Sequence, residues 1–241
     1  MIYFIGAGPG AVDLITVRGA KILSEAGRII FAGSLVNPDL VKTYARSDCE
    51  IFDSAVMTLE EISQKIIEGH EKNLVTVRLH SGDPSLYGAI REQIEILDKN
   101  QIPFEIVPGV SSLFAASAAL KTEFMIPEIT QSLLISRVEG RTAAPDDNFS
   151  TVLFLSSGMI ERACAKLIQK NYSPKTPAAL VYKASWPDEK IIRGTLETLP
   201  ALAKEAGINK TALILVGDFL DKNFNTKSKL YDKNFSHEYR K

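Results

Sequence analysis

The sequence predicts an α/β protein built from two domains. Short runs rich in β-branched and aromatic residues alternate with segments of helical periodicity along the chain, which is typical of α/β architectures. Three of the early apolar runs are followed directly by glycine-rich turns, as the strands of open parallel sheets often are. The alternation breaks at residues 122–129, which include Pro127, so we expect domains at 1–121 and 122–241.

The first domain is expected to alternate strands and helices. We expect strands at residues 2–5, 28–32, 49–52, 74–79 and 104–107. We expect helices at residues 17–26, 38–44, 59–70, 87–100 and 111–120. In the third of these helices, Leu59, Ile62, Ile66 and Ile67 recur at helical spacing, which predicts one buried face.

The second domain is expected to contain more antiparallel pairing. We expect strands at residues 131–137, 151–155, 178–182, 190–193 and 212–216, and helices at 160–170 and 196–206. The strand at 190–193 is expected to return antiparallel from a turn at 185–189. Beyond Asp221 the chain is polar, with a few aromatic residues that are able to dock.

Composition excludes several classes of protein. The 241 residues are 45% hydrophobic and 24% charged, with a net charge of −1, so we expect a globular protein and no nucleic-acid partner. Cys49 and Cys164 are isolated, which favours a reducing compartment and neither a disulfide framework nor a metal site. No apolar stretch approaches the ~20 residues of a membrane span, and no charged leader precedes residues 2–5. We therefore expect a cytoplasmic protein with no membrane partner.

The first glycine turn, Gly6-Ala7-Gly8-Pro9-Gly10-Ala11, matches the dinucleotide fingerprint G-x-G-x-x-[GA]. Three features oppose a nicotinamide site there. Pro9 removes a backbone N–H where a pyrophosphate needs donors, and residues 9–13 have the composition of a loop. The second strand ends Phe31-Ala32-Gly33-Ser34, without an acidic residue for a ribose hydroxyl. We therefore favour a tight turn that lets the backbone approach a ligand or another strand.

Two more glycine turns follow later strands. The second glycine turn, Ser81-Gly82-Asp83-Pro84, follows the fourth strand, and the third, Pro108-Gly109-Val110-Ser111-Ser112, follows the fifth. Taken alone, Ser81 and Asp83 fit the cap of a helix that begins near Leu86. Ligands bind at the carboxyl edge of open α/β sheets, so three such turns favour a cofactor site there.

The remaining polar groups leave the chemistry open. Residues 137–142 form a charged segment, which fits a solvated loop or a pair of arginines that grip carboxylates. His80 lies between a strand and the second glycine turn, and a structural role is favoured over a base or a ligand. The spacing reveals neither a Ser/His/Asp constellation nor a metal site, and the catalytic residue is unknown.

These glycine turns resemble those of the tetrapyrrole methylases. Residues 3–10, residues 81–84 with Tyr87-Gly88, and residues 108–112 resemble the three glycine motifs of that family, and the resemblance covers essentially the whole chain. Residues 31–36, 139–142 and 228–231, with Phe235-Ser236-His237, resemble the branch that methylates precorrin-4 or cobalt-precorrin-4 at carbon 11. Two departures are mild: Ala11 stands where the family usually has an acidic residue, and Ala143-Ala144-Pro145 replaces Pro-Glu.

The resemblance implies two α/β domains with a ligand cleft between them, usually in a homodimer. It implies S-adenosylmethionine as methyl donor, S-adenosylhomocysteine as product and a small-molecule tetrapyrrole substrate. Carried over by position, the donor contacts in the first domain are Pro9, Ser81, Gly82, Asp83, Leu86, Ser111 and Ser112. Those in the second are Ser156, Ala184, Ala212 and Leu213. Substrate carboxylates would bind Arg137, Arg141 and Lys183.

Two alternatives stay open beside methylation at carbon 11. One is a sibling enzyme that acts on another macrocycle carbon, on ribosomal RNA or on a protein. The other is a module that binds the same ligands without catalysis. The sequence does not say whether the macrocycle carries cobalt when it is methylated.

Overall fold

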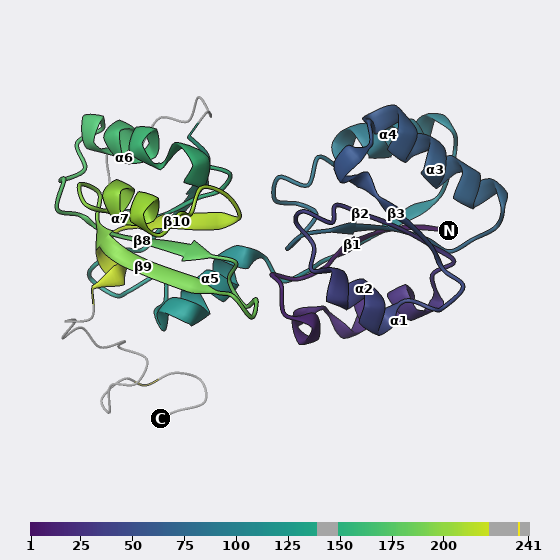
Figure 1. Cartoon of the computed structure of the whole chain (residues 1–241), viewed down its shortest axis with the longest axis horizontal. Coiled ribbons are helices and arrows are strands. Elements are labelled where there is room, and N and C mark those ends of the chain that lie inside the picture. Colours follow the sequence, from purple (N-terminus) through teal and green to yellow (C-terminus); the bar gives the residue numbers. More distant parts are fainter. Residues whose placement is uncertain (139–148, 222–235, 237–241) are drawn as a thin grey trace. The chain divides into compact units, whose positions relative to one another are not determined.

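The computed structural model describes residues 1–138, 149–221 and Ser236. Contacts divide the chain into two compact units (Figure 1). Unit 1 comprises Met1–Ala115 and Lys183–Asp188, and unit 2 comprises Ala116–Tyr182 and Glu189–Lys241. The segment Lys183–Asp188 therefore makes its contacts in unit 1, although the strands on either side of it in the sequence belong to unit 2.

Unit 1 is built on a five-stranded parallel sheet. Its strands are β1 (Ile2–Gly6), β2 (Arg28–Phe31), β3 (Glu50–Asp53), β4 (Thr76–His80) and β5 (Phe104–Val107). They lie in the order β3-β2-β4-β1-β5, and every neighbouring pair is parallel. The carboxyl ends of all five strands therefore meet at one edge, with β1 between β4 and β5.

Helices cover both faces of this sheet. They are α1 (Val17–Glu25), α2 (Pro38–Tyr44), α3 (Leu59–Glu71) and α4 (Arg91–Lys99), with short 3₁₀ turns η1 (Val12–Leu14) and η2 (Ser54–Val56). Helices α1 and α2 lie on one face, and α3 and α4 lie on the other (Figure 1). A capping box of Thr58 and Glu61 starts α3, and Ile62 and Ile66 bury its apolar face as the periodicity predicts.

The segment before α4 departs from the prediction. A helix was expected from residue 87, but α4 begins only at Arg91. Tyr87 and Ala89 have left-handed backbone, with φ of 56° and 47°, and this conformation cannot continue into a right-handed helix. The expected start of this helix near Leu86 is therefore wrong, and the residues after the second glycine turn form a tight loop before α4 begins.

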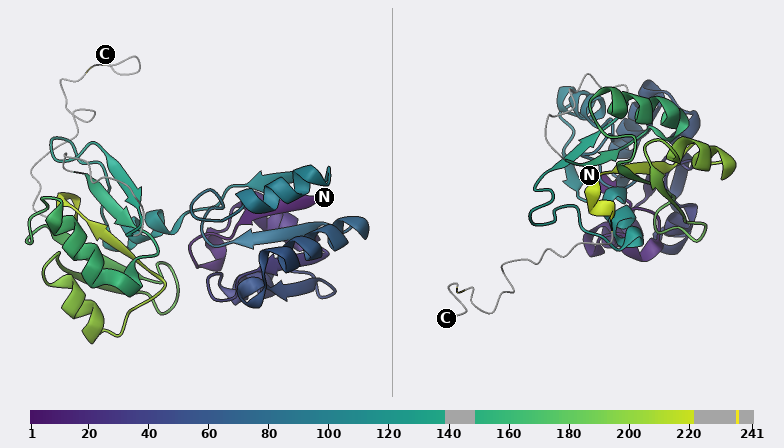
Figure 2. Two further views of the ribbon diagram at one scale, coloured as in Figure 1. Left: turned by 90° about the horizontal axis from the view of Figure 1, so that it is seen from above. Right: turned by 90° about the vertical axis from the view of Figure 1, so that its left-hand side faces the viewer.

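Unit 2 contains a mixed five-stranded sheet. After α5 (Ser112–Leu120) come β6 (Leu133–Ser136), β7 (Ser150–Leu153), η3 (Ser157–Met159), α6 (Ile160–Gln169), β8 (Pro177–Tyr182), β9 (Lys190–Thr195), α7 (Leu199–Glu205), β10 (Ala212–Val216) and η4 (Asp218–Leu220). The strand order is β6-β7-β10-β8-β9; β6 and β7 are parallel and the other pairs antiparallel (Figure 2). The antiparallel return of β9 is confirmed.

The core of unit 2 lies between this sheet and the helices α6 and α7, which cover one of its faces (Figure 1). Leu180 and Ile214 on the strands pack in one buried cluster with Ala163 of α6 and Leu199 of α7. Within the part of the chain that the structure describes, no helix is long and apolar enough to cross a membrane.

Candidate active site

The three glycine turns meet at the carboxyl edge of the sheet in unit 1. They follow β1, β4 and β5, which are neighbours in the sheet. Gly8 and Gly82 exchange two backbone hydrogen bonds: the Gly82 N–H donates to the Gly8 carbonyl at 2.8 Å, and the Gly8 N–H to the Gly82 carbonyl at 3.2 Å. The first and second glycine turns are thus joined directly, as the sheet topology requires.

Close packing of the backbone explains two of the glycines. A Cβ atom on Gly109 would lie 2.2 Å from the Gly82 carbonyl oxygen and 2.6 Å from the Gly6 Cα. Gly82 has φ of +65°, in the left-handed region that side chains with a Cβ rarely adopt. Glycine at these positions therefore lets the three turns pack backbone against backbone at this edge.

Asp83 joins the second glycine turn to the third. Its Oδ2 accepts a hydrogen bond from the Gly109 N–H at 2.8 Å, and its Oδ1 accepts one from the Ser85 N–H at 2.8 Å and another from the Ser85 hydroxyl. Burial raises the pKa of Asp83, but these hydrogen bonds together outweigh burial and hold the pKa below its usual value. The carboxylate is ionised at neutral pH, and it does not cap α4, which begins at Arg91.

The polar groups of the first glycine turn are already bonded within the protein. The Pro9 carbonyl accepts a hydrogen bond from the Trp186 indole N–H at 3.0 Å, and the Gly10 carbonyl accepts one from the Asn37 amide at 2.9 Å. The Ala11 N–H donates to the Ser185 hydroxyl at 3.0 Å. Three backbone donors of this turn are engaged as well: the Ala7 N–H donates to the His80 carbonyl and the Gly8 N–H to the Gly82 carbonyl, beside the Ala11 N–H. A pyrophosphate needs free N–H donors, so this turn is poorly suited to a dinucleotide, as the sequence indicates.

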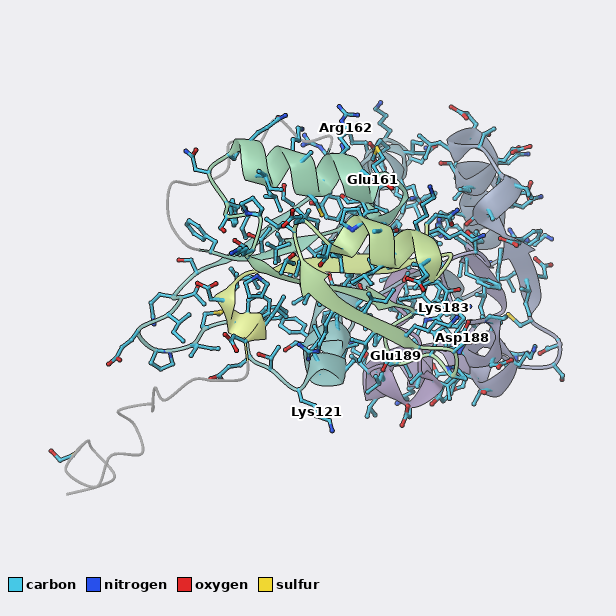
Figure 3. The ribbon with its side chains drawn as sticks, turned by 60° about the vertical axis from the view of Figure 1, so that its left-hand side comes forward. Lys121, Glu161, Arg162, Lys183, Asp188 and Glu189 are labelled. Carbon is cyan, nitrogen blue, oxygen red and sulfur yellow. The ribbon has the colours of Figure 1, made fainter. Side chains whose placement is uncertain are left out.

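The segment Lys183–Asp188 completes this corner of unit 1. The Lys183 ammonium donates to Asp188 at 2.7 Å, and Figure 3 labels both residues. The ammonium also lies 4.9 Å from the centre of the Trp186 ring. Ala184, one of the expected donor contacts, is buried beside Ser185. The structure therefore brings Ala184 into unit 1 together with Pro9. Lys183 was expected to bind substrate, and in this structure its ammonium is engaged by Asp188.

The other expected donor contacts of unit 1 lie in the same turns. Ser81 is exposed, Leu86 is half-buried with its N–H donated to the Asp83 carbonyl, and Ser111 is buried at the start of α5. Ser112 is the first residue of that helix. Pro9, Ser81, Gly82, Asp83, Leu86, Ala184, Ser111 and Ser112 are thus all carried by unit 1.

His80 ends β4 as a buried side chain. It is 6% exposed, its ring centre lies 6.0 Å from that of Phe4, and its Nε2 has no hydrogen-bond partner among the described residues. Burial, and to a smaller extent the charge of Arg78, lowers the pKa of His80 to about 3. The imidazole is therefore neutral at physiological pH, and its packing against Phe4 fits a structural role.

In unit 2, Ser156 is fully buried, and its hydroxyl donates to the Phe154 carbonyl at 2.7 Å and accepts from the Val138 N–H at 3.1 Å. Ala212 and Leu213 begin β10, and Arg137 is exposed after β6. Arg141 lies outside the described residues. The Ser156 hydroxyl thus fixes the local backbone, and a donor contact there would come from other atoms of the residue.

Comparison with protein families assigns the chain that carries these three glycine turns. The model of the tetrapyrrole (corrin/porphyrin) methylases matches residues 1–200, which include all three glycine turns. This chain is a tetrapyrrole methylase. The resemblance seen in the sequence is therefore confirmed, and with it the α/β fold of the family.

Individual relatives of this methylase are similar along its whole length. The cobalt-precorrin-4 C(11)-methyltransferase of Methanocaldococcus jannaschii is 49% identical over 100% of this chain and 96% of its own. The precorrin-4 C(11)-methyltransferase of a Sinorhizobium species is 39% identical over 99% and 98%. A solved cobalt-precorrin-4 methyltransferase is 41% identical, with a TM-score of 0.85 over 91% of this chain and 95% of its own.

A fourth relative has a ligand. The uroporphyrin-III C-methyltransferase of Thermus thermophilus, solved in complex with S-adenosylhomocysteine, is 25% identical to this methylase, with a TM-score of 0.76. The match covers 91% of this chain and 98% of the other.

Three residues that shape the site of this methylase were not anticipated from its sequence. Asn37, Ser185 and Trp186 bond the first glycine turn, although they lie far from it in the sequence. Asn37 carried a signal for a different role, because Asn before Pro marks a helix start, and its side chain does cap α2. No spacing rule connects residues 185 and 186 with residues 9–11.

Proposed function

We propose that this enzyme transfers the methyl group of S-adenosylmethionine to carbon 11 of precorrin-4 or cobalt-precorrin-4, in corrin biosynthesis. The observation that carries the proposal is full-length identity of 49% and 39% to relatives named for that reaction, together with a family match that includes the three glycine turns. The complex of the Thermus thermophilus relative with S-adenosylhomocysteine supports the same donor here.

The donor is proposed to bind at the edge formed by the glycine turns. Its contacts in unit 1 are Pro9, Ser81, Gly82, Asp83, Leu86, Ala184, Ser111 and Ser112, and those in unit 2 are Ser156, Ala212 and Leu213. The left-handed backbone of Gly82 shapes the second glycine turn, and the ionised Asp83 offers a negative charge that attracts a sulfonium or ammonium group. When bound, the donor supplies an already activated methyl group on a positively charged sulfur.

Methyl transfer from the donor requires little acid–base catalysis by the protein. The methyl carbon leaves sulfur, which keeps the electron pair of the broken bond as a neutral thioether, and bonds to an electron-rich ring carbon. Holding the two reactants in line and excluding water contributes up to ~7–11 kcal/mol. This fits a site beside which His80 is buried and neutral.

Substrate carboxylates are proposed to bind Arg137, Arg141 and Lys183. The two guanidinium groups can hold a carboxylate through paired hydrogen bonds, and the Lys183 ammonium offers a point charge. We further propose domains at 1–121 and 122–241. A homodimer located in the cytoplasm, without nucleic-acid or membrane partners, completes the proposal. The near-neutral net charge supports the exclusion of nucleic acid.

The test is direct methyl transfer. Purified enzyme is incubated with S-adenosylmethionine carrying an isotopically labelled methyl group, and with precorrin-4 or cobalt-precorrin-4. We expect mass spectrometry to show the gain of one methyl group, and NMR to place the label on carbon 11. Label on another ring carbon would favour the sibling enzyme, and donor binding without transfer would favour a binding module. Comparing cobalt-loaded with metal-free substrate decides which precursor is used.

A further inference from the structure

The segment Lys183–Asp188 supplies two side chains that bond the first glycine turn. Trp186 donates its indole N–H to the Pro9 carbonyl at 3.0 Å, and Ser185 accepts the Ala11 N–H at 3.0 Å. The indole also packs against Gly10, where a Cβ atom would lie only 2.0 Å from the Trp186 Cδ1. These contacts fix both sides of Gly10 to one short segment.

Local interactions hold Trp186 in this orientation. The backbone N–H of Trp186 donates to the Lys183 carbonyl at 2.9 Å. The Lys183 ammonium lies 4.9 Å from the centre of the Trp186 ring and is paired with Asp188 at 2.7 Å. Lys183 and Ser185 both have left-handed backbone, with φ of 46° and 69°. Left-handed backbone at residues other than glycine is unfavourable and persists only where surrounding contacts enforce it. The segment is therefore shaped for the contacts it makes.

The same contacts connect two of the residues that are proposed to bind the methyl donor. Pro9 is held by Trp186, and Ala184 directly precedes Ser185 in the segment. Neither Trp186 nor Ser185 is among the residues carried over from the family motifs. Each bonds the backbone of the first glycine turn through its side chain.

We propose that Ser185 and Trp186 are positioning residues for the methyl donor: they hold the Pro9–Ala11 backbone and Ala184 in the arrangement that the donor binds. The inference rests on the proposed function, since it concerns affinity for that donor. It assigns Ser185 and Trp186 a role in donor binding and none in the transfer step itself.

The experiment compares Trp186→Phe, which keeps an aromatic ring against Gly10 but lacks the N–H, with Ser185→Ala, which lacks the acceptor for Ala11. Loss of one hydrogen bond at the site is expected to weaken S-adenosylhomocysteine binding about two- to tenfold in each variant, measured by calorimetry. The KM for S-adenosylmethionine is expected to rise in parallel, while kcat and the KM for the tetrapyrrole stay close to the wild-type values. Tyr172→Phe is the matched control, because it removes a hydroxyl 3.3 Å from Thr151 in unit 2 and should leave donor affinity unchanged.

Tryptophan fluorescence tests the contact independently of the stability of the fold. Trp186 is the only tryptophan of the chain, so its emission reports on this contact alone. We expect S-adenosylhomocysteine to change that emission along the same binding curve as calorimetry. Donor affinity unchanged in both Trp186→Phe and Ser185→Ala, with wild-type emission insensitive to ligand, would overturn the inference and leave the proposed function intact. Absence of donor binding by the wild type would overturn both.

Discussion

At the scale of single residues, Gly82 combines a backbone constraint with a place in the proposed donor site. Its φ of +65° disfavours any side chain, and a Cβ atom there would lie 3.5 Å from Ser111 Cα and Ser112 N, in ordinary contact. The branches of a valine would extend beyond that Cβ, into the space between the second and third glycine turns.

Gly82→Val is therefore expected to abolish binding of S-adenosylhomocysteine and to lower the free energy of unfolding by about 1–2 kcal/mol, the cost of left-handed backbone. Gly207→Val is the matched control, because Gly207 has φ of +67° with nothing within 4 Å of an added Cβ. It should show a similar loss of stability with normal donor binding. Calorimetry and urea unfolding measure the two quantities; normal donor binding by Gly82→Val would remove Gly82 from the site.

Asp83 offers a test through pH. Its pKa is held low in the folded protein, so the ionised carboxylate stabilises the fold at pH values above its unfolded pKa, and this contribution is lost as the pH falls through the folded pKa. Asp83→Asn leaves the Gly109 N–H poorly bonded and is expected to cost about 1 kcal/mol at neutral pH. The difference in the free energy of unfolding between wild type and variant should shrink below about pH 4, near the ordinary pKa of aspartate. Urea unfolding across pH measures it; a difference that does not vary with pH would contradict the role assigned to the carboxylate.

At the scale of elements, the strands and most helices of unit 1 lie close to where the sequence predicts them. Their signals are local: a buried parallel strand is a continuous apolar run, and an amphipathic helix such as α3 repeats at helical spacing. The start of α4 was wrong because Tyr87 and Ala89 adopt left-handed backbone without being glycine. Neither residue type signals that conformation, so the periodic pattern alone extends the helix too far.

The contact between the ends of β1, β4 and β5 is expected to be intolerant of added volume. In Gly109→Ala, the new Cβ would lie 2.2 Å from the Gly82 carbonyl oxygen, and backbone on both sides leaves it no space. We expect a loss of about 1–3 kcal/mol in the free energy of unfolding, as for other overpacked sites. In the control Gly27→Ala, the nearest atom is the flexible Leu74 Cδ2 at 3.0 Å, and the loss should be smaller. Equal losses in urea unfolding would show that the strand ends adjust freely.

At the scale of the whole molecule, the glycine turns and the family were predictable, because short motifs at strand ends carry both. The bonds from Ser185 and Trp186 to Pro9–Ala11 were not, since they join residues that lie 174 and 177 positions apart. Such contacts depend on how the complete chain folds, and hydrophobic periodicity contains no information about them.

Ligand binding provides a test at this scale. Because a ligand that binds only the folded state stabilises it by mass action, S-adenosylhomocysteine at a hundredfold excess over its dissociation constant should add about 2.7 kcal/mol to the free energy of unfolding. NAD should add nothing, since the Ala7, Gly8 and Ala11 N–H groups that would bind its pyrophosphate are already donated within the protein. Urea unfolding with each ligand checks both expectations, and stabilisation by NAD alone would overturn the assignment of the donor.

The dependence of the first glycine turn on residues near the other end of the chain has a consequence during synthesis. The ribosome makes Pro9–Ala11 before Trp186, which follows roughly nine to thirty-five seconds later at ~5–20 residues per second. Until then, the Pro9 carbonyl and the Ala11 N–H have only water as partners in place of Trp186 and Ser185. The first glycine turn therefore reaches its final form only after residues 185 and 186 have been made, so a nascent chain released before residue 186 could not complete it.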